Sequence, residues 1–267
     1  MKNILIDTHA HLYVKSFSTD REMILERART EGVKKVYLPA IDSETHEAML
    51  DLEAKHPDFC IAMMGVHPCS INDETIADEL KIAEKHLKKR PFCAIGEIGI
   101  DLYWDKTTFD VQKRAFIQQM HWAQDLSLPI IIHSRNSMEE VIATLRENAW
   151  FTEGGILHCF TGDTDQAKQL IDMGFYLGIG GVVTYKNSGL DAVVAAIDLK
   201  HLVLETDAPY LAPVPFRGKR NESSYVKYVV EKISEIKTVH YNEVAQITTA
   251  NAEAIFSKTS KSISPAI

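Results

Sequence analysis

The chain has 267 residues, 45% of them apolar, and a formal net charge of −8. This length fits one large domain with a sizeable core, and a (β/α)8 barrel needs about 250 residues. The acidic balance argues against a protein that coats nucleic acid through a broad basic face, although a phosphate-bearing substrate could enter a locally positive pocket.

Short apolar runs alternate with amphipathic patterns along the chain. The apolar runs predict eight strands, at residues 4–8, 35–39, 59–65, 92–96, 129–133, 155–159, 175–179 and 202–205. Helical patterns lie between them, at residues 20–31, 43–55, 76–89, 108–127, 137–148, 164–173 and 190–197. Regular strand–helix alternation with eight strands predicts an α/β protein, a parallel sheet closed into a TIM barrel. An open doubly wound sheet is the alternative, but the first strand is not followed by that fold's glycine-rich turn.

The prediction is a single barrel domain over residues 1–267, with a polar tail from about residue 257. We expect no association with a membrane, because no apolar run approaches the ~18 residues of a membrane span. The four cysteines lack the spacing of a disulfide framework or a CxxC motif. Reduced thiols and a cytoplasmic location are therefore expected.

Metal-ligand residue types gather at the ends of the predicted strands, where barrel enzymes hold their chemistry. The first strand ends in His9 and His11, which are two residues apart and therefore share one face. The further residues of this kind are His67, Glu97, His133, His158, Glu205 and Asp207. Any one of them alone could be a hydrogen-bonded core residue. Together, five imidazoles and three carboxylates at one barrel mouth predict a bound cation.

Imidazole and carboxylate ligands without a thiolate suit Zn, Mn or Mg ions, among others. The set exceeds what one catalytic ion takes, which predicts two divalent ions bridged by Glu97. Cys159 follows His158 directly, so strand alternation points its side chain the opposite way, and we interpret it as a packing residue.

The strand-end motifs resemble those of the TatD-type metal-dependent hydrolases and nucleases, in the amidohydrolase-like barrel superfamily. The matching motifs are Asp7-Thr8-His9-Ala10-His11, Gly65-Val66-His67-Pro68, Gly96-Glu97-Ile98-Gly99-Ile100-Asp101, His133-Ser134-Arg135, His158-Cys159-Phe160, Glu205-Thr206-Asp207 and Arg217-Gly218-Lys219-Arg220-Asn221-Glu222. The resemblance implies that one ion is held by His9, His11, Glu97 and Asp207. It implies that the second is held by Glu97, His133 and His158. The chain departs from the family pattern at Tyr13, where an acidic residue is common, and at Ser223, where proline is common.

The remaining candidates have open alternatives. Asp207 is the candidate proton acceptor and, with Glu97, a candidate catalytic residue, but it could act as a ligand alone. Glu205 is expected to orient a ligand imidazole, or to be a buried structural carboxylate. His67 is a candidate phosphate contact or proton donor, or a packing residue. Phosphate-binding candidates are Arg135, Arg217 and Arg220, because guanidinium groups match phosphate geometry, although the basic segment could be a solvated loop.

The leading hypothesis is a metal-dependent hydrolase that uses a metal-activated water to cleave phosphodiester bonds. The resemblance implies that this hydrolase is a nuclease, a deoxyribonuclease or exonuclease, with DNA or another nucleic acid as a transient partner. Hydrolysis of an ester or amide, such as deacylation of an aminoacyl-RNA, is the alternative, because the same ions polarise carbonyls. A metal-stabilised barrel acting as a binding module is the third hypothesis. The physiological metal, the mode of cleavage and the oligomeric state stay open.

Overall fold

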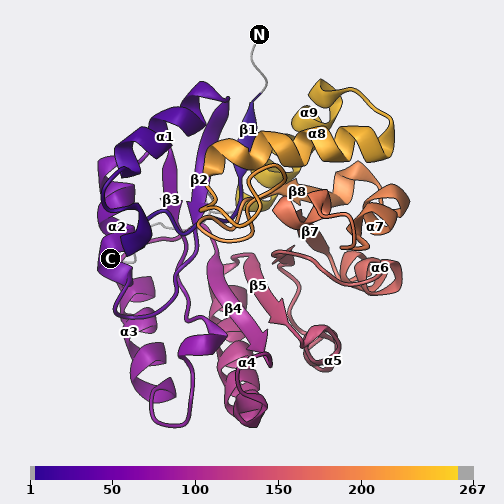
Figure 1. Cartoon of the computed structure of the whole chain (residues 1–267). Coiled ribbons are helices and arrows are strands. Elements are labelled where there is room, and N and C mark those ends of the chain that lie inside the picture. Colours follow the sequence, from indigo (N-terminus) through magenta and orange to yellow (C-terminus); the bar gives the residue numbers. More distant parts are fainter. Residues whose placement is uncertain (1–3, 258–267) are drawn as a thin grey trace.

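The computed structural model describes residues 4–257 and confirms the predicted TIM-type α/β architecture, with parallel strands ringed by helices (Figure 1). The strands are β1 (Leu5–Asp7), β2 (Val33–Leu38), β3 (Cys60–Ala62), β4 (Ile95–Asp101), β5 (Ile130–Arg135), β6 (Gly155–Leu157), β7 (Phe175–Ile179) and β8 (Leu202–Leu204). The helices are α1 (Arg21–Thr30), α2 (His46–Lys55), α3 (Ile76–Lys89), α4 (Phe109–Leu126), α5 (Met138–Glu147), α6 (Thr164–Asp172), α7 (Leu190–Ala196), α8 (Val226–Lys237) and α9 (Tyr241–Phe256).

The barrel is assembled from two parallel sheets. Strands β1 to β3 form one sheet and β4 to β8 the other, each in sequence order. Isolated parallel bridges close the ring, Met64 with Ile95 on one side and Ala10 with Ala208 on the other. All eight strands therefore run in the same direction, and their carboxyl ends meet at one mouth.

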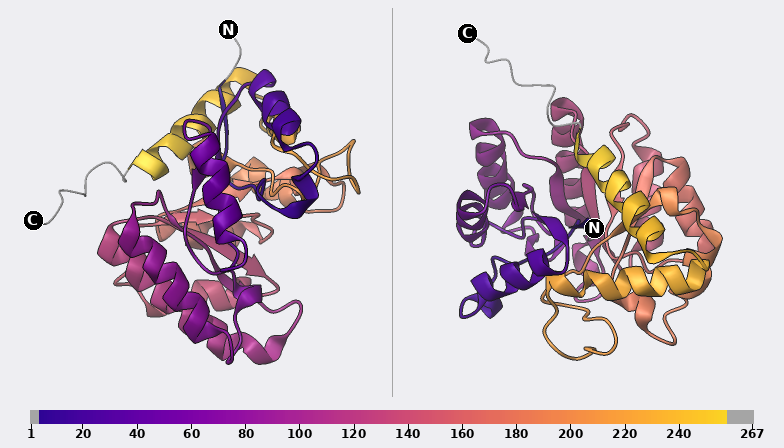
Figure 2. Two further views of the ribbon diagram at one scale, coloured as in Figure 1. Left: turned by 90° about the vertical axis from the view of Figure 1, so that its left-hand side faces the viewer. Right: turned by 90° about the horizontal axis from the view of Figure 1, so that it is seen from above.

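Helix α9 covers the opposite, amino-terminal end of the barrel. Its Thr249 donates a hydrogen bond to the Ile4 carbonyl oxygen at 2.8 Å, beside the start of β1. The ring of Phe256 stacks on Tyr37 of β2 with 3.7 Å between the centroids. Figure 2 shows α9 passing close to the N-terminal strand. With this end covered, the carboxyl-terminal mouth is left for a functional site.

The fourth strand differs most from its prediction. It was expected at residues 92–96, but β4 begins at Ile95 and runs on through Gly96 and Gly99 to Asp101. These glycines belong to the strand because it lies against its neighbour too closely for side chains. A Cβ on Gly99, whose φ is 139°, would lie 2.1 Å from the His133 carbonyl oxygen. Glu97 therefore lies inside a strand and not after one.

Two further differences concern the C-terminal part of the chain. Helices α8 and α9 both follow β8, and the predicted helices ended at residue 197. The expected polar tail lies almost entirely at residues 258–267, outside the described residues. Among residues 4–257, no helix has the length and apolar character needed to cross a membrane.

Candidate metal centre

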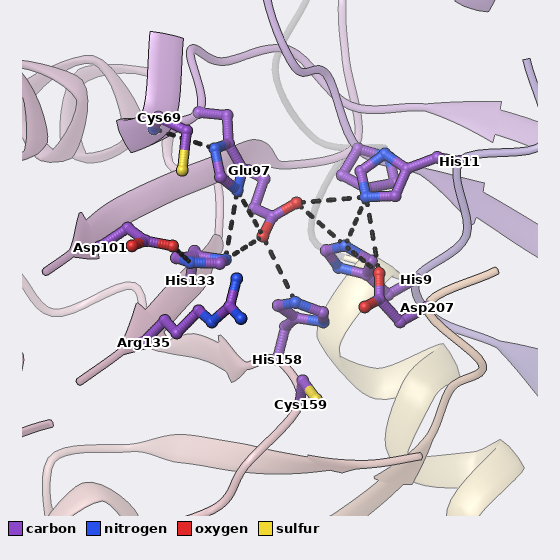
Figure 3. A network of polar contacts seen from close by, with 12 residues as sticks. His9, His11, Cys69, Glu97, Asp101, His133, Arg135, His158, Cys159 and Asp207 are labelled. Carbon is purple, nitrogen blue, oxygen red and sulfur yellow. Dashed lines mark hydrogen bonds and ion pairs between the residues drawn. The ribbon is translucent and has the colours of Figure 1, made fainter. Parts of the chain in front are cut away.

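Several of the predicted residues continue the inward-facing side of their strands up to the barrel mouth. Ile131, Ile156 and Val203 belong to one buried apolar cluster within the barrel. Because side chains two residues apart on a strand share a face, His133 and His158 continue the face of their strands toward the mouth. Glu205 follows Val203 in the same way. The apolar layer thus forms the floor beneath the polar residues drawn in Figure 3.

Glu97 occupies the middle of this group because of an irregularity in its strand. Gly96 pairs with Ile131 and Ile98 with Ile132, so the register shifts across Glu97. Such a bulge re-aims the side chain of the extra residue. The Glu97 carboxylate is 1% exposed, and the predicted ligands surround both of its oxygens (Figure 3).

One oxygen of Glu97 faces the ligands from the ends of β1 and β8. Its Oε2 lies 3.1 Å from His9 Nε2 and 3.4 Å from His11 Nε2. Asp207 Oδ1 completes this group, 3.8 Å from His9 Nε2 and 3.6 Å from His11 Nε2. Four donor atoms from three strands therefore face one another.

The other oxygen of Glu97 faces a second set of imidazoles. Its Oε1 lies 2.8 Å from His133 Nδ1, 3.3 Å from His158 Nε2 and 3.4 Å from His67 Nε2. The two sets are in contact, because the rings of His9 and His158 stack with 3.5 Å between their centroids. Glu97 thus lies between two groups of potential metal ligands.

Two of these imidazoles have a hydrogen-bond acceptor on the ring nitrogen that points away from Glu97, and a third has a carboxylate near that nitrogen. His133 Nε2 donates to Asp101 Oδ2 at 2.9 Å. His158 Nδ1 lies 3.2 Å from Glu205 Oε1, close enough for electrostatic attraction, but it has no hydrogen-bond partner among the described residues. His11 Nδ1 lies 3.0 Å from the Tyr13 hydroxyl. An acceptor there keeps the ring proton on the outer nitrogen, so the lone pair faces inward as a metal ligand requires. The groups beside these outer nitrogens are two carboxylates and one neutral phenol.

His67 has the opposite arrangement of donor and acceptor. Its Nδ1 accepts a hydrogen bond from the Cys69 backbone N–H at 3.1 Å. A neutral imidazole has one donor and one acceptor nitrogen, so the proton of neutral His67 is on Nε2. That nitrogen faces Glu97 Oε1 and also lies 3.2 Å from His133 Nδ1. In this tautomer His67 offers the centre an N–H donor and no lone pair.

The ionisation of the group is strongly interdependent. Burial by itself would raise the pKa of Glu97, but the imidazoles of His9, His67 and His158 hold that pKa well below its usual range. Burial lowers the pKa of His9 well below its usual range. Burial would also lower the pKa of His158, yet Glu205 and Glu97 raise it to about 10. Burial raises the pKa of Asp207 to about 6. Without a cation, protons on histidine must balance the buried carboxylates.

The residues fit a divalent cation. Glu97 Oε2 is a buried atom that lacks a hydrogen-bond partner among the described residues. A buried carboxylate oxygen without such a partner is costly, and a cation would satisfy it. His9, His11 and Asp207 offer donor atoms within 4.8 Å of one another, as do His9, Glu97 and His158. His67 lies within the same distance of Glu97 and His133, but in the tautomer set by Cys69 it presents an N–H to this group.

The three predicted phosphate-binding arginines have different surroundings. Arg135, at the end of β5, stacks over the ring of Tyr103 at 3.7 Å. Arg217 stacks over Tyr185 at 4.4 Å. Arg220 instead binds the carboxylate of Asp20 and donates to the Ser16 carbonyl oxygen at 2.6 Å. Its charge is thus already matched within the protein, and it ties its loop to the segment before α1.

Sequence reasoning did not assign a role to Asp101 or Asp7. Asp101 contacts His133 from the end of β4. It was missed because the predicted strand ended at residue 96, five residues before it. Asp7 is fully buried and accepts hydrogen bonds from the Thr206 backbone and hydroxyl at 2.9 and 2.6 Å. It holds the β8 end against β1. Cys159, interpreted as a packing residue, is partly buried and belongs to none of the candidate ligand groups.

The fold and this donor set define a class. A parallel barrel that collects imidazoles and carboxylates at the carboxyl ends of its strands has the architecture of a metal-dependent hydrolase. Comparison with known proteins agrees. Residues 6–257 match the family described as TatD related DNase. The chain belongs to the TatD family of metal-dependent hydrolases.

Individual relatives cover nearly the whole chain. The metal-dependent hydrolase YabD of Bacillus subtilis is 43% identical over 254 residues, 95% of this chain and 99% of the relative. The 3'-5' ssDNA/RNA exonuclease TatD of Pectobacterium parmentieri is 32% identical, over 94% of this chain and 99% of the relative. The crystal structure of the TatD homologue YJJV from Escherichia coli superposes with a TM-score of 0.88 at 31% identity, covering 96% of this chain and 99% of that chain.

Proposed function

We propose that the protein is a two-metal phosphodiesterase that acts on nucleic acid, most specifically on single-stranded DNA ends. The observation that carries this proposal is the position of Glu97, whose two oxygens face two separate groups of ligands. A carboxylate in that position can bridge two divalent ions, which is the arrangement of many phosphodiesterases.

The ligand assignment follows the two oxygens. His9, His11, Asp207 and Glu97 would hold one ion; His133, His158 and Glu97 would hold the other. Bound Zn, Mn or Mg ions would supply Lewis-acid activation of water and of the phosphoryl oxygen. Asp101 would hold the ring of His133 in the required tautomer through its hydrogen bond to Nε2. Glu205, 3.2 Å from His158 Nδ1, would favour a proton on that nitrogen by its charge.

Two residues are suited to handle protons. The Asp207 side chain is 13% exposed, against 1% for Glu97, so it can be reached by water and can accept a proton from it. His67 presents its Nε2–H toward the centre, as its hydrogen bond from Cys69 requires. That donor suits a phosphate oxygen or a leaving alkoxide.

The choice of a nucleic acid substrate rests on the relatives and on local charge. A relative that matches this chain over 94% of its length is named as an exonuclease of single-stranded DNA and RNA. Arg135 and Arg217 make no ion pair within residues 4–257 and could receive phosphates. We also propose a cytoplasmic location, supported by the four free cysteines.

The test is hydrolysis of labelled oligonucleotides by protein loaded with Mn, Mg or Zn. Wild type is compared with Glu97→Gln, which removes one anionic oxygen, and with Glu243→Gln, a matched change on the outer helix α9. We expect cleavage by wild type and Glu243→Gln and none by Glu97→Gln. Activity that persists in Glu97→Gln would indicate a contaminant. Faster turnover of acyl esters or aminoacyl-RNA than of any phosphodiester would favour the alternative hydrolase.

A further inference from the structure

Two exposed aromatic residues lie directly beyond β4, next to the candidate metal centre. Tyr103 is 51% exposed and Trp104 is 73% exposed. Their rings meet edge to face, with 4.8 Å between the centroids. Large aromatic surfaces with this exposure at the mouth of a barrel are typical of a ligand contact.

The guanidinium of Arg135 joins this pair. It lies 3.7 Å from the Tyr103 ring centroid and 5.5 Å from that of Trp104. Among the described residues, no carboxylate forms an ion pair with it, in contrast to Arg220. A guanidinium stacked through its flat face keeps its in-plane N–H groups free for a phosphate. Figure 3 shows the Arg135 side chain on the same side of its strand as His133.

The position of this surface is fixed relative to the metal ligands. One oxygen of Asp101 accepts a hydrogen bond from the Tyr103 backbone N–H at 2.9 Å, and the other lies 2.9 Å from His133 Nε2. The Leu102 N–H also donates to the Arg135 carbonyl oxygen at 2.9 Å. A single carboxylate therefore connects the aromatic segment to a candidate ligand of the centre.

We propose that Tyr103, Trp104 and Arg135 form a nucleotide seat, which binds one nucleotide of a single-stranded substrate beside the scissile phosphate. The indole face of Trp104 stacks on the base, and Arg135 contacts the adjacent phosphate. Stacking on an aromatic face requires an unpaired base and is tolerant of its identity. The seat therefore selects single strands over duplexes without selecting a sequence. This inference rests on the proposed nuclease function.

The experiment measures KM and kcat on single-stranded oligonucleotides that carry one abasic residue at each of the four terminal positions in turn. Trp104→Ala and Trp104→Phe are compared with wild type and with Trp150→Ala. Trp150 is a matched control, because it is 38% exposed and stacked on His121, and it lies between α5 and β6 at the opposite end of the barrel. Thermal unfolding verifies that each variant is folded.

We expect wild type to show a KM at least about tenfold lower for the intact strand than for the strand that lacks the base at the seat. Trp104→Ala should lose this preference, while Trp104→Phe and Trp150→Ala should keep most of it. If Trp104→Ala keeps the wild-type preference for the intact strand over the abasic strand, the proposal of a nucleotide seat is wrong, even where the enzyme cleaves DNA. If wild type cleaves no oligonucleotide with any of the three metals, the proposed function itself fails, and the seat fails with it.

Discussion

The phenol of Tyr13 sets the protonation of one predicted ligand through hydrogen bonds alone. Its oxygen lies 3.0 Å from His11 Nδ1 and 2.5 Å from the Pro39 carbonyl oxygen. Because a carbonyl oxygen only accepts, the phenol donates to Pro39 and accepts from the His11 Nδ1–H. The His11 lone pair is thereby left on Nε2, which faces Glu97 and Asp207.

The substitution Tyr13→Phe removes both hydrogen bonds and leaves one buried donor and one buried acceptor without partners. Each unsatisfied group costs about 1–3 kcal/mol, so the free energy of unfolding of the metal-free protein should fall by about 2–6 kcal/mol. Loss of an outer partner of a metal-binding histidine costs about 10–100-fold in affinity. We therefore expect metal affinity to fall by this factor, about 1.4–2.8 kcal/mol.

Metal affinity is measured by competition with a chelating dye, and stability by urea unfolding of the metal-free protein. Tyr185→Phe is the matched control, because the Tyr185 hydroxyl donates to the Ala212 carbonyl oxygen at 2.9 Å without touching a predicted ligand. The control should lose stability and keep wild-type metal affinity. A Tyr13→Phe protein that binds metal as tightly as wild type would refute the reasoning.

Four further outcomes are expected. Glu97→Gln should lower oligonucleotide hydrolysis by at least about 1,000-fold and reduce the number of bound ions, measured by elemental analysis. Arg135→Ala should raise KM for oligonucleotides and reduce the slope of log Kd against log salt by about 1, measured by fluorescence anisotropy. Gly99→Ala should lower the free energy of unfolding by at least about 2 kcal/mol, because its Cβ would meet the His133 carbonyl oxygen at 2.1 Å; equal urea midpoints would contradict this. Metal at 100 times its Kd should raise the free energy of unfolding by about 2.7 kcal/mol, and a chelator should reverse it.

The sequence was sufficient for the ring of strands and for most of the polar mouth. Strand alternation and strand-end position are local properties, so His9 and His11 could be placed together without coordinates. The same reasoning predicted that His133 and His158 lie at the barrel mouth. Glu97 lies among the other candidate ligands as expected, but the prediction placed it just after a strand. In the structure its strand continues four residues beyond it.

The properties that escaped prediction depend on contacts between distant segments. The Arg220 guanidinium pairs with Asp20, 200 residues earlier, and no local pattern indicates that partner. The link from Asp101 to His133 depends on the glycines of β4 approaching β5, which only the packed sheet reveals. His46 is likewise buried by a distant segment: it is 2% exposed, and its Nε2 lies 3.3 Å from the Gly65 carbonyl oxygen.

The bridge between Ala10 and Ala208 has a mechanical consequence, because it joins the first sheet to the last strand inside the ligand cluster. The His11 N–H donates to the Ala208 carbonyl oxygen at 2.7 Å, and the Asp207 N–H donates to that of His9 at 2.9 Å. Ions held by these side chains would link the segments that follow β1 and β8, where the ring of strands closes. Amide hydrogen exchange at His11 and Asp207 should then slow on metal loading. Metal occupancy of the site and stability of the closed barrel against local opening would therefore be coupled.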